Sequence, residues 1–190
     1  MKSVLFAVLA VVLAGCSTAW PENASINPQI NDQPDNLLAG QSVSVSGQDV
    51  RSGHQIIKIN KQGEPVVLIP NAISPDQVMA DRLQKGLAAQ GATIAPQGGA
   101  EVKVIVQNML AEVTKPGLAY KTRVRMEVKL QVQKNGAGIA KTYQKSAMKE
   151  SATQPDMGDI ELMLNDQTSK LLNDMLSDSQ VRAVIKGSNY

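Results

Sequence analysis

The stretch LAYKTRVRMEVKLQVQ, residues 118–133, decides the fold class of this chain. Apolar and polar side chains alternate along it with a period of two, as they do on a β-strand with one buried and one wet face. The expected buried face carries Tyr120, Thr122, Val124, Met126, Val128, Leu130 and Val132. This pattern is typical of an antiparallel sheet that is covered on one side only.

More strands are predicted on both sides of this stretch. Alternating valines predict a strand through Val102, Val104 and Val106. Asn135-Gly136 is a strong hairpin signal, so residues 139–147 should form the partner strand. Upstream, short apolar runs between residues 43 and 70 predict up to three further strands.

Two segments carry the signals of helices. Ser74-Pro75-Asp76-Gln77 combines an N-cap serine, a proline at the first helical position and a glutamine at the third, so a helix should begin there and end near Gly91. After Pro155, apolar residues at spacings of three and four predict a long helix through residues 160–176, followed by a short one at 181–185.

These patterns together predict the fold class. We expect an α+β domain over residues 41–190, with a mainly antiparallel sheet and two principal helices packed on one face. No internal repeat or second core is visible in the sequence.

The N-terminus has the features of a cleaved signal peptide, residues 1–15. A lysine at position 2 precedes eleven apolar residues, too few for a bilayer, which needs about 20, but suited to a secretion signal. Leu13-Ala14-Gly15-Cys16 then resembles the lipobox of bacterial lipoproteins. That resemblance implies cleavage between Gly15 and Cys16, a diacylglyceryl (palmitate-type) thioether on the sulfur and an acylated amino group. The alternatives are an unmodified thiol after an ordinary signal, or a cytosolic protein with an apolar start.

Lipidation would set the location of the chain. Two or three acyl chains hold a protein on a membrane almost permanently, and Ser17 lacks the aspartate that favours inner-membrane retention. We therefore expect an outer-membrane protein that faces the periplasm. Proline and asparagine are frequent in residues 16–40, which predicts a lipidated cysteine followed by a flexible, disordered tether. Trp20 would lie either at headgroup depth or exposed on that tether.

The charge of the chain is unevenly distributed. The total is only +2, which excludes a globally basic nucleic-acid protein, yet residues 103–149 hold ten Lys and Arg against two acids. We expect four cations in a row on the open face of the long strand, with Lys141, Lys145 and Lys149 on the neighbouring strand; the four are Lys121, Arg123, Arg125 and Lys129. They could hold an anionic partner, such as lipid head groups or an acidic protein. The other interpretation is that they solvate the sheet and guard its edges.

We expect no catalytic site, no metal and no cofactor. His54 is the only histidine and is interpreted as an exposed loop residue, with no Gly-x-Ser-x-Gly elbow near it. The acids of the long helix complement its dipole and show no calcium-loop pattern; they are Asp156, Asp159, Glu161 and Asp166. Asp49 and Arg51 are interpreted as a structural ion pair rather than a site. The single cysteine excludes a disulfide framework or a thiolate zinc cluster.

The whole layout resembles the YajG family of bacterial lipoproteins. The likeness is carried by the order and spacing of weak motifs: Leu13-Ala14-Gly15-Cys16, the Asn/Pro-rich segment, Val43-Ser44-Val45, Gly47-Gln48-Asp49-Val50-Arg51, Leu83 to Gly91, the turn before Tyr120, Asn135-Gly136 and Tyr143. The resemblance implies an outer-membrane lipoprotein with a small α/β domain and no assigned activity.

We therefore expect a non-enzymatic lipoprotein, anchored in the outer membrane through a triacylated Cys16, whose domain binds an envelope protein or an anionic lipid. Binding would use strand addition to a sheet edge or the row of cations. Nucleic acid is not an expected partner. The alternative is a structural accessory module of an envelope transport or cell-wall assembly complex, and a periplasmic hydrolase ranks third.

Overall fold

The computed structural model describes residues 20–31 and 34–187 of the chain. The predicted signal peptide, its cleavage after Gly15 and the lipidation of Cys16 lie outside the described residues. The described part forms seven strands and three helices: β1 (Ser42–Asp49), β2 (Gln55–Asn60), β3 (Val67–Pro70), α1 (Pro75–Ala89), β4 (Thr93–Ile94), β5 (Ala100–Thr114), β6 (Tyr120–Lys134), β7 (Ala137–Ser151), α2 (Met157–Ser177) and α3 (Ser179–Lys186).

The sheet is mixed, so the prediction of a mainly antiparallel sheet is wrong. β5, β6 and β7 form the predicted antiparallel meander, and β3 is antiparallel to β2. However, β1 and β2 lie end to end along the other edge of β5 and both run parallel to it, as does β4 to β1. The crossover through α1 brings the chain back before β5 begins, and such a crossover allows parallel pairing.

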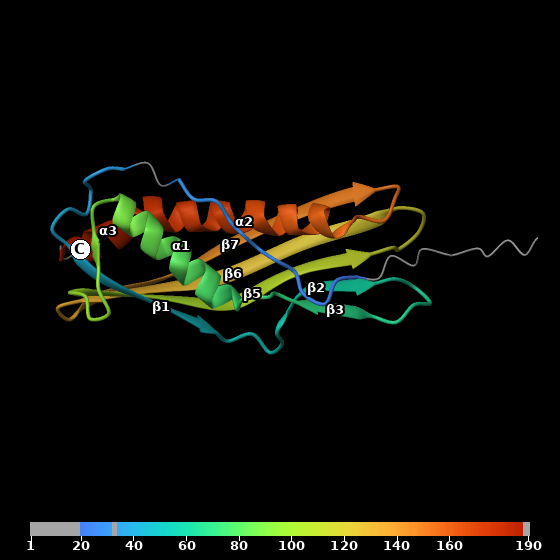
Figure 1. Cartoon of the computed structure of the whole chain (residues 1–190), viewed down its shortest axis with the longest axis horizontal. Helices are drawn as coiled ribbons and strands as arrows, with labels where there is room; N and C mark the ends of the chain where they lie inside the picture. Colours follow the sequence, from blue (N-terminus) through green and yellow to red (C-terminus); the bar gives the residue numbers. More distant parts are fainter. Residues whose placement is uncertain (1–19, 32–33, 188–190) are drawn as a thin grey trace, which may run out of the picture.

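The helices all cover one face of this sheet, as predicted (Figure 1). α1 packs against β1 and β5, whereas α2 and α3 pack against β6 and β7. The predicted apolar face of β6 is buried from Thr122 to Val132, with Tyr120 partly buried at its start. α2 contributes fully buried side chains to the same core, among them Ile160, Leu164 and Leu171. No described helix or strand covers the opposite face of the sheet, called here the open face.

Residues 24–31 pack along α2, so the prediction of a flexible tether is wrong here. Every second backbone N–H donates to a side chain at every fourth position of the helix: Ser25 to Glu161 Oε1 (2.7 Å), Asn27 to Asn165 Oδ1 (2.6 Å), Gln29 to Ser169 Oγ (2.8 Å) and Asn31 to Asn173 Oδ1 (2.8 Å). Two residues of an extended segment span about 6.6 Å, and four residues of a helix span about 6 Å. The spacing of the N–H donors along residues 25–31 therefore matches the spacing of the acceptor side chains along α2. The side chains between them, Ala24, Ile26 and Pro28, are buried.

Residues 35–40 are also part of the domain. Leu38 is fully buried, and its N–H donates to the carbonyl of Gln90 at 2.7 Å, while that of Asp35 donates to Ala89 at 2.9 Å. These bonds satisfy carbonyls at the C-terminal end of α1 that the helix leaves without partners. Trp20 packs against the core as well, so it is not a fully exposed tether residue; its predicted position at headgroup depth stays a prediction.

The polar ladder on α2 gives a testable expectation. The double variant Asn165→Ala and Asn173→Ala removes two acceptors, each worth about 1 kcal/mol, so amide exchange across residues 25–31 should accelerate about tenfold or more. Hydrogen-exchange mass spectrometry of the folded protein measures this. Leu162→Ala, at a helix position that is 67% exposed, is the control and should leave exchange unchanged. Equal exchange in both variants would show that the ladder does not hold the segment.

Candidate functional site

The four cations predicted to form a row do lie together on the open face of β6. Lys121, Arg123, Arg125 and Lys129 alternate with the buried side chains of that strand. Lys121 forms an ion pair with Glu150 of β7 at 3.0 Å. Within the described residues, the other three make no salt bridge, and Arg123 Nη2 lies 3.7 Å from Met148 Sδ. A binding role for the row stays a prediction.

Acidic side chains share this face and weaken its positive potential. Glu112 lies opposite Arg123 in the register and forms an ion pair with Lys58 at 3.0 Å. Glu127 stands in the row itself and accepts a hydrogen bond from Gln144 at 3.1 Å. Glu101 lies on the same face of β5. The face therefore carries mixed charge.

The three lysines of β7 face away from this row, which corrects the prediction for the neighbouring strand. Lys141, Lys145 and Lys149 lie opposite Leu130, Met126 and Thr122 of β6, so they share the face that the helices cover. There they pair with acids of α2 and of the α2–α3 junction: Lys141 with Asp178, Lys145 with Asp174 at 2.6 Å and Lys149 with Asp159 at 2.9 Å. Counting from the Asn135-Gly136 turn would have revealed this orientation.

Asp178 is the most heavily bonded of these acids. It caps α3 by accepting the N–H groups of Gln180 at 2.9 Å and Val181 at 3.3 Å, and it accepts hydrogen bonds from Lys141 and from the Tyr143 hydroxyl, the latter at 2.8 Å. Burial alone would raise the pKa of Asp178, but these donors hold the pKa below its ordinary value. The residue therefore joins β7 to the last turn of α2 and the start of α3.

The lowered pKa of Asp178 predicts an acid-sensitive contribution to stability. The unfolded carboxyl has a pKa of about 3.9, so the stabilisation is complete above this value and is lost as the pH falls through the lower folded pKa. Asp178→Asn keeps an acceptor for the cap of α3 but loses the charge-assisted hydrogen bond from Lys141, so it should reduce the free energy of unfolding at pH 7 by about 1–2 kcal/mol and should shrink the fall of that free energy between pH 7 and pH 3. Urea denaturation measures both. Glu150→Gln, at an exposed ion pair, is the control; an equal change there would contradict the expectation.

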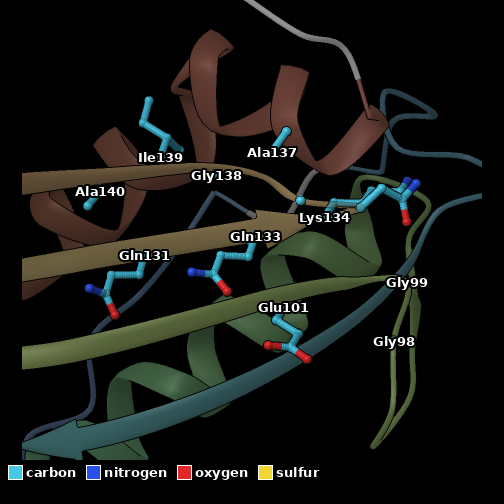
Figure 2. A pocket seen from close by; sticks show the side chains of 12 residues that line it. Gly98, Gly99, Glu101, Gln131, Gln133, Lys134, Ala137, Gly138, Ile139 and Ala140 are labelled. Carbon is cyan, nitrogen blue, oxygen red and sulfur yellow. The ribbon is translucent and has the colours of Figure 1, made fainter.

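A hollow lies at the hairpin end of the sheet. It has a volume of about 570 Å³, and its lining includes Glu101, Gln131, Gln133, Lys134 and the Asn135-Gly136 turn. Figure 2 shows Gln131 and Gln133 on β6, with Glu101 beside them on the neighbouring strand β5. Lys134 Nζ donates to the carbonyl of Ile185 at 2.7 Å and to Gln41, so it is held in the structure rather than presented to a ligand.

Other residues weighed as sites have structural contacts. Asp156 caps α2 by accepting the N–H of Asp159 at 2.7 Å, Glu161 holds Ser25, and Asp166 pairs with Lys170 at 2.7 Å. Asp49 and Arg51 form the expected structural pair, with Arg51 Nη2 2.8 Å from Asp49 Oδ2. His54 lies in the loop between β1 and β2. The described residues contain no cluster of three His, Cys, Asp or Glu side chains that could hold a metal ion.

The sequence predicts strand addition to a sheet edge but does not identify the outer edge of β7 as that edge. This strand has 15 residues and, among the described strands, pairs with β6 alone. Lysines often guard such an edge, but those of β7 are drawn towards α2. The open face of the strand offers mostly small and uncharged side chains, including Thr142 and Ser146. The only available signal was that β7 ends the meander.

None of the helices in the described part of the chain combines the length and apolar character needed to cross a membrane.

Comparison with known proteins identifies a protein family that this chain matches. A model described as "Uncharacterized lipoprotein" matches residues 28–186. The uncharacterized lipoprotein YajG of Escherichia coli K12 is 27% identical over 190 residues, covering 97% of both chains, and that of Escherichia coli O6:H1 matches equally.

Solved structures share the fold at low sequence identity. Protein XCC0632 from Xanthomonas campestris has a TM-score of 0.58 at 7% identity, over 86% of this chain and 95% of that one. The crystal structure of an uncharacterized protein has a TM-score of 0.50 at 14% identity, over 82% and 97% of the two chains. These likenesses concern the fold alone.

Proposed function

Because the chain belongs to the family of uncharacterized lipoproteins that matches residues 28–186, we propose that it is a lipid-anchored, non-enzymatic binding protein of the outer membrane. Cys16, preceded by Leu13-Ala14-Gly15, would carry the acyl chains, and the domain would face the periplasm. Membership in this family supports the assignment of the chain as a lipoprotein. The outer-membrane location rests on Ser17 and is part of the proposal.

The binding role rests on the outer edge of β7. A strand edge of 15 residues offers a row of backbone N–H and C=O groups, to which an extended peptide can add as a further strand. We propose that the partner is an extended segment of another envelope protein. Its side chains would meet the uncharged open face of β7 around Thr142 and Ser146.

The row of cations on β6 is the weaker candidate for this role. Lys121 is paired, and Glu112 and Glu127 lie next to the remaining cations, so the summed attraction for an anionic partner is reduced. The absence of an enzymatic role is also part of the proposal. It is supported by the structural contacts that already engage Asp156, Glu161 and Lys134.

Photo-crosslinking in intact envelopes tests the edge of β7. A photoreactive residue at Thr142 is compared with one at Ile105, which lies level with it on β5, two strands inward and about 10 Å away. We expect protein adducts from Thr142 and few from Ile105. A peptide copied from the captured segment should then slow amide exchange in β7 and leave β5 unchanged.

The opposite results have distinct meanings. Adducts from Ile105 or Arg125 in preference to Thr142 would place binding on the open face and refute strand addition. Adducts with lipid or glycan alone would refute a protein partner. A captured protein that stays bound in a fixed ratio through purification, without protecting β7, would favour the accessory module of an envelope complex.

A further inference from the structure

Three loops meet at one end of the sheet, opposite the Asn135-Gly136 turn. They are residues 61–66 after β2, 115–119 after β5 and 152–156 after β7, called here the loop end. The strand register brings them together, since Asn60 pairs with Thr114, and Tyr120 with Ser151. Lys61 Nζ also donates to Gln154 Oε1 at 3.2 Å, which joins the first loop to the third.

The loop end exposes apolar side chains. Leu118 is 96% exposed and Val66 is 50% exposed. Pro116 and Gly117 supply the residues that the turn before β6 needs, so the turn does not require a leucine at position 118. Lys115 lies beside it, with Nζ 4.8 Å from the centre of the Tyr120 ring. A single exposed leucine is common on protein surfaces, so its meaning depends on what lies nearby.

The described chain begins on this side of the molecule. Ala24 forms a parallel bridge with Asn71, and its N–H donates to the carbonyl of Pro70 at 2.9 Å. Because the bridge is parallel, the chain before Ala24 lies on the side towards the loop after β2. Figure 1 shows this first segment, in blue, starting beside β2 and β3.

The distance to the predicted anchor is short. Only three residues separate Cys16 from Trp20, so the two Cα atoms are at most about 15 Å apart. Trp20 packs against the core and cannot extend this reach without leaving it. β5 alone, with 15 residues, is about 45–50 Å long. An acylated Cys16 therefore holds the bilayer near the loop end and far from the opposite end of the sheet.

We infer that the loop end rests on the bilayer that holds Cys16, with Leu118 and Val66 at the boundary between head groups and acyl chains. Lys115 lies at the level of the lipid phosphates, where a cation is favoured. The sheet then stands away from the membrane, and the outer edge of β7 remains accessible in the periplasm. This inference rests on the proposed lipid anchor.

Depth-dependent fluorescence quenching tests the orientation. The full-length lipidated protein is placed in vesicles of three parts phosphatidylethanolamine to one part phosphatidylglycerol. Leu118→Cys carries a single environment-sensitive fluorophore, because acylation blocks Cys16. Gln97→Cys, exposed in the loop before β5 at the far end, is the matched control. A lipid with a spin label near the head group should quench the label at 118 at least about threefold more than the label at 97.

Vesicle flotation tests the lipid anchor separately from the orientation of the loop end. If the protein floats with the vesicles but both labels are quenched equally, or the label at 97 more strongly, the orientation is wrong and the anchor stands. If the wild-type protein does not float, the anchor is wrong and the orientation is refuted with it. Leu118→Asp, in an exposed loop, should keep the thermal stability of the domain and lower the quenching of a label at Val66→Cys.

Discussion

Replacing Arg51 with methionine is expected to destabilise the domain by about 3–5 kcal/mol, because it removes the arginine of a partly buried ion pair together with its two hydrogen bonds to backbone carbonyls. The Arg51 side chain is 6% exposed and binds Asp49 twice, with Nε 2.9 Å from Oδ1 and Nη2 2.8 Å from Oδ2. Burial alone would raise the pKa of Asp49, but the hydrogen bonds from Arg51 hold the pKa below its ordinary value. Without Arg51, a partly desolvated carboxylate would remain without its partner.

The position of Arg51 in the sheet increases the expected loss of stability in Arg51→Met. β1 pairs with β5 only as far as Val106, and β2 pairs with it only from Ala111. In the gap between them, Arg51 Nη1 donates to the carbonyls of Met109 at 3.1 Å and Gln55 at 3.0 Å. One guanidinium therefore joins three strands of the mixed sheet.

Urea and thermal denaturation measure the effect of Arg51→Met. A loss of this size should lower Tm by about 6–20 °C in a domain of this length. The matched control is Arg123→Met on the open face, which should change stability by no more than about 0.5 kcal/mol. Asp49→Asn combined with Arg51→Met should cost less than the two changes added together, because the two side chains interact. Strict additivity, or a loss below about 1 kcal/mol for Arg51→Met, would contradict this account.

The second large effect is expected at Cys16. Cys16→Ser should convert a protein that is almost entirely membrane-bound into one that is almost entirely released or left unprocessed. Each buried methylene contributes about 0.8 kcal/mol to membrane binding, so the loss of two or three acyl chains abolishes stable anchoring. Membrane fractionation and mass spectrometry of the mature N-terminus measure the change.

Two controls separate anchoring from sorting. Ser17→Asp should keep the lipid but move the protein from the outer to the inner membrane, which density-gradient fractionation resolves. Globomycin, which inhibits the lipoprotein signal peptidase, should cause the unprocessed form to accumulate. If processing continues unchanged in its presence, the chain is not matured as a lipoprotein.

Local patterns predicted the elements that depend on local chemistry. The alternation through β6 identified its buried face because side chains on a strand point to opposite sides in turn. Asn135 and Gly136 have φ values of 51° and 82°, which is the left-handed conformation that an Asn-Gly hairpin turn requires. α1 begins at Pro75, as the signals around Ser74 predicted, although the Ser74 side chain makes no capping bond.

The features that were missed depend on neighbours distant in the sequence. Residues 24–31 looked like a tether because prolines and asparagines cannot form a core by themselves, yet their backbone is held by α2, about 140 residues later. The period of two in β1 and β2 is compatible with either strand direction, so it did not reveal their parallel pairing with β5. The facing of Lys141, Lys145 and Lys149 is a different case, because it follows from the register of the local Asn135-Gly136 hairpin.

The sequence by itself determined the α+β class, the buried face of β6, the two principal helices and the family resemblance, because periodicity, capping and turn chemistry act within a few residues. Only the tertiary structure decided that the sheet is mixed, that Arg51 joins the strands where β1 and β2 meet, and that β7 pairs with β6 alone among the described strands. Each of these features depends on which strands pair when they are far apart in the sequence. The packing of the whole core determines that pairing.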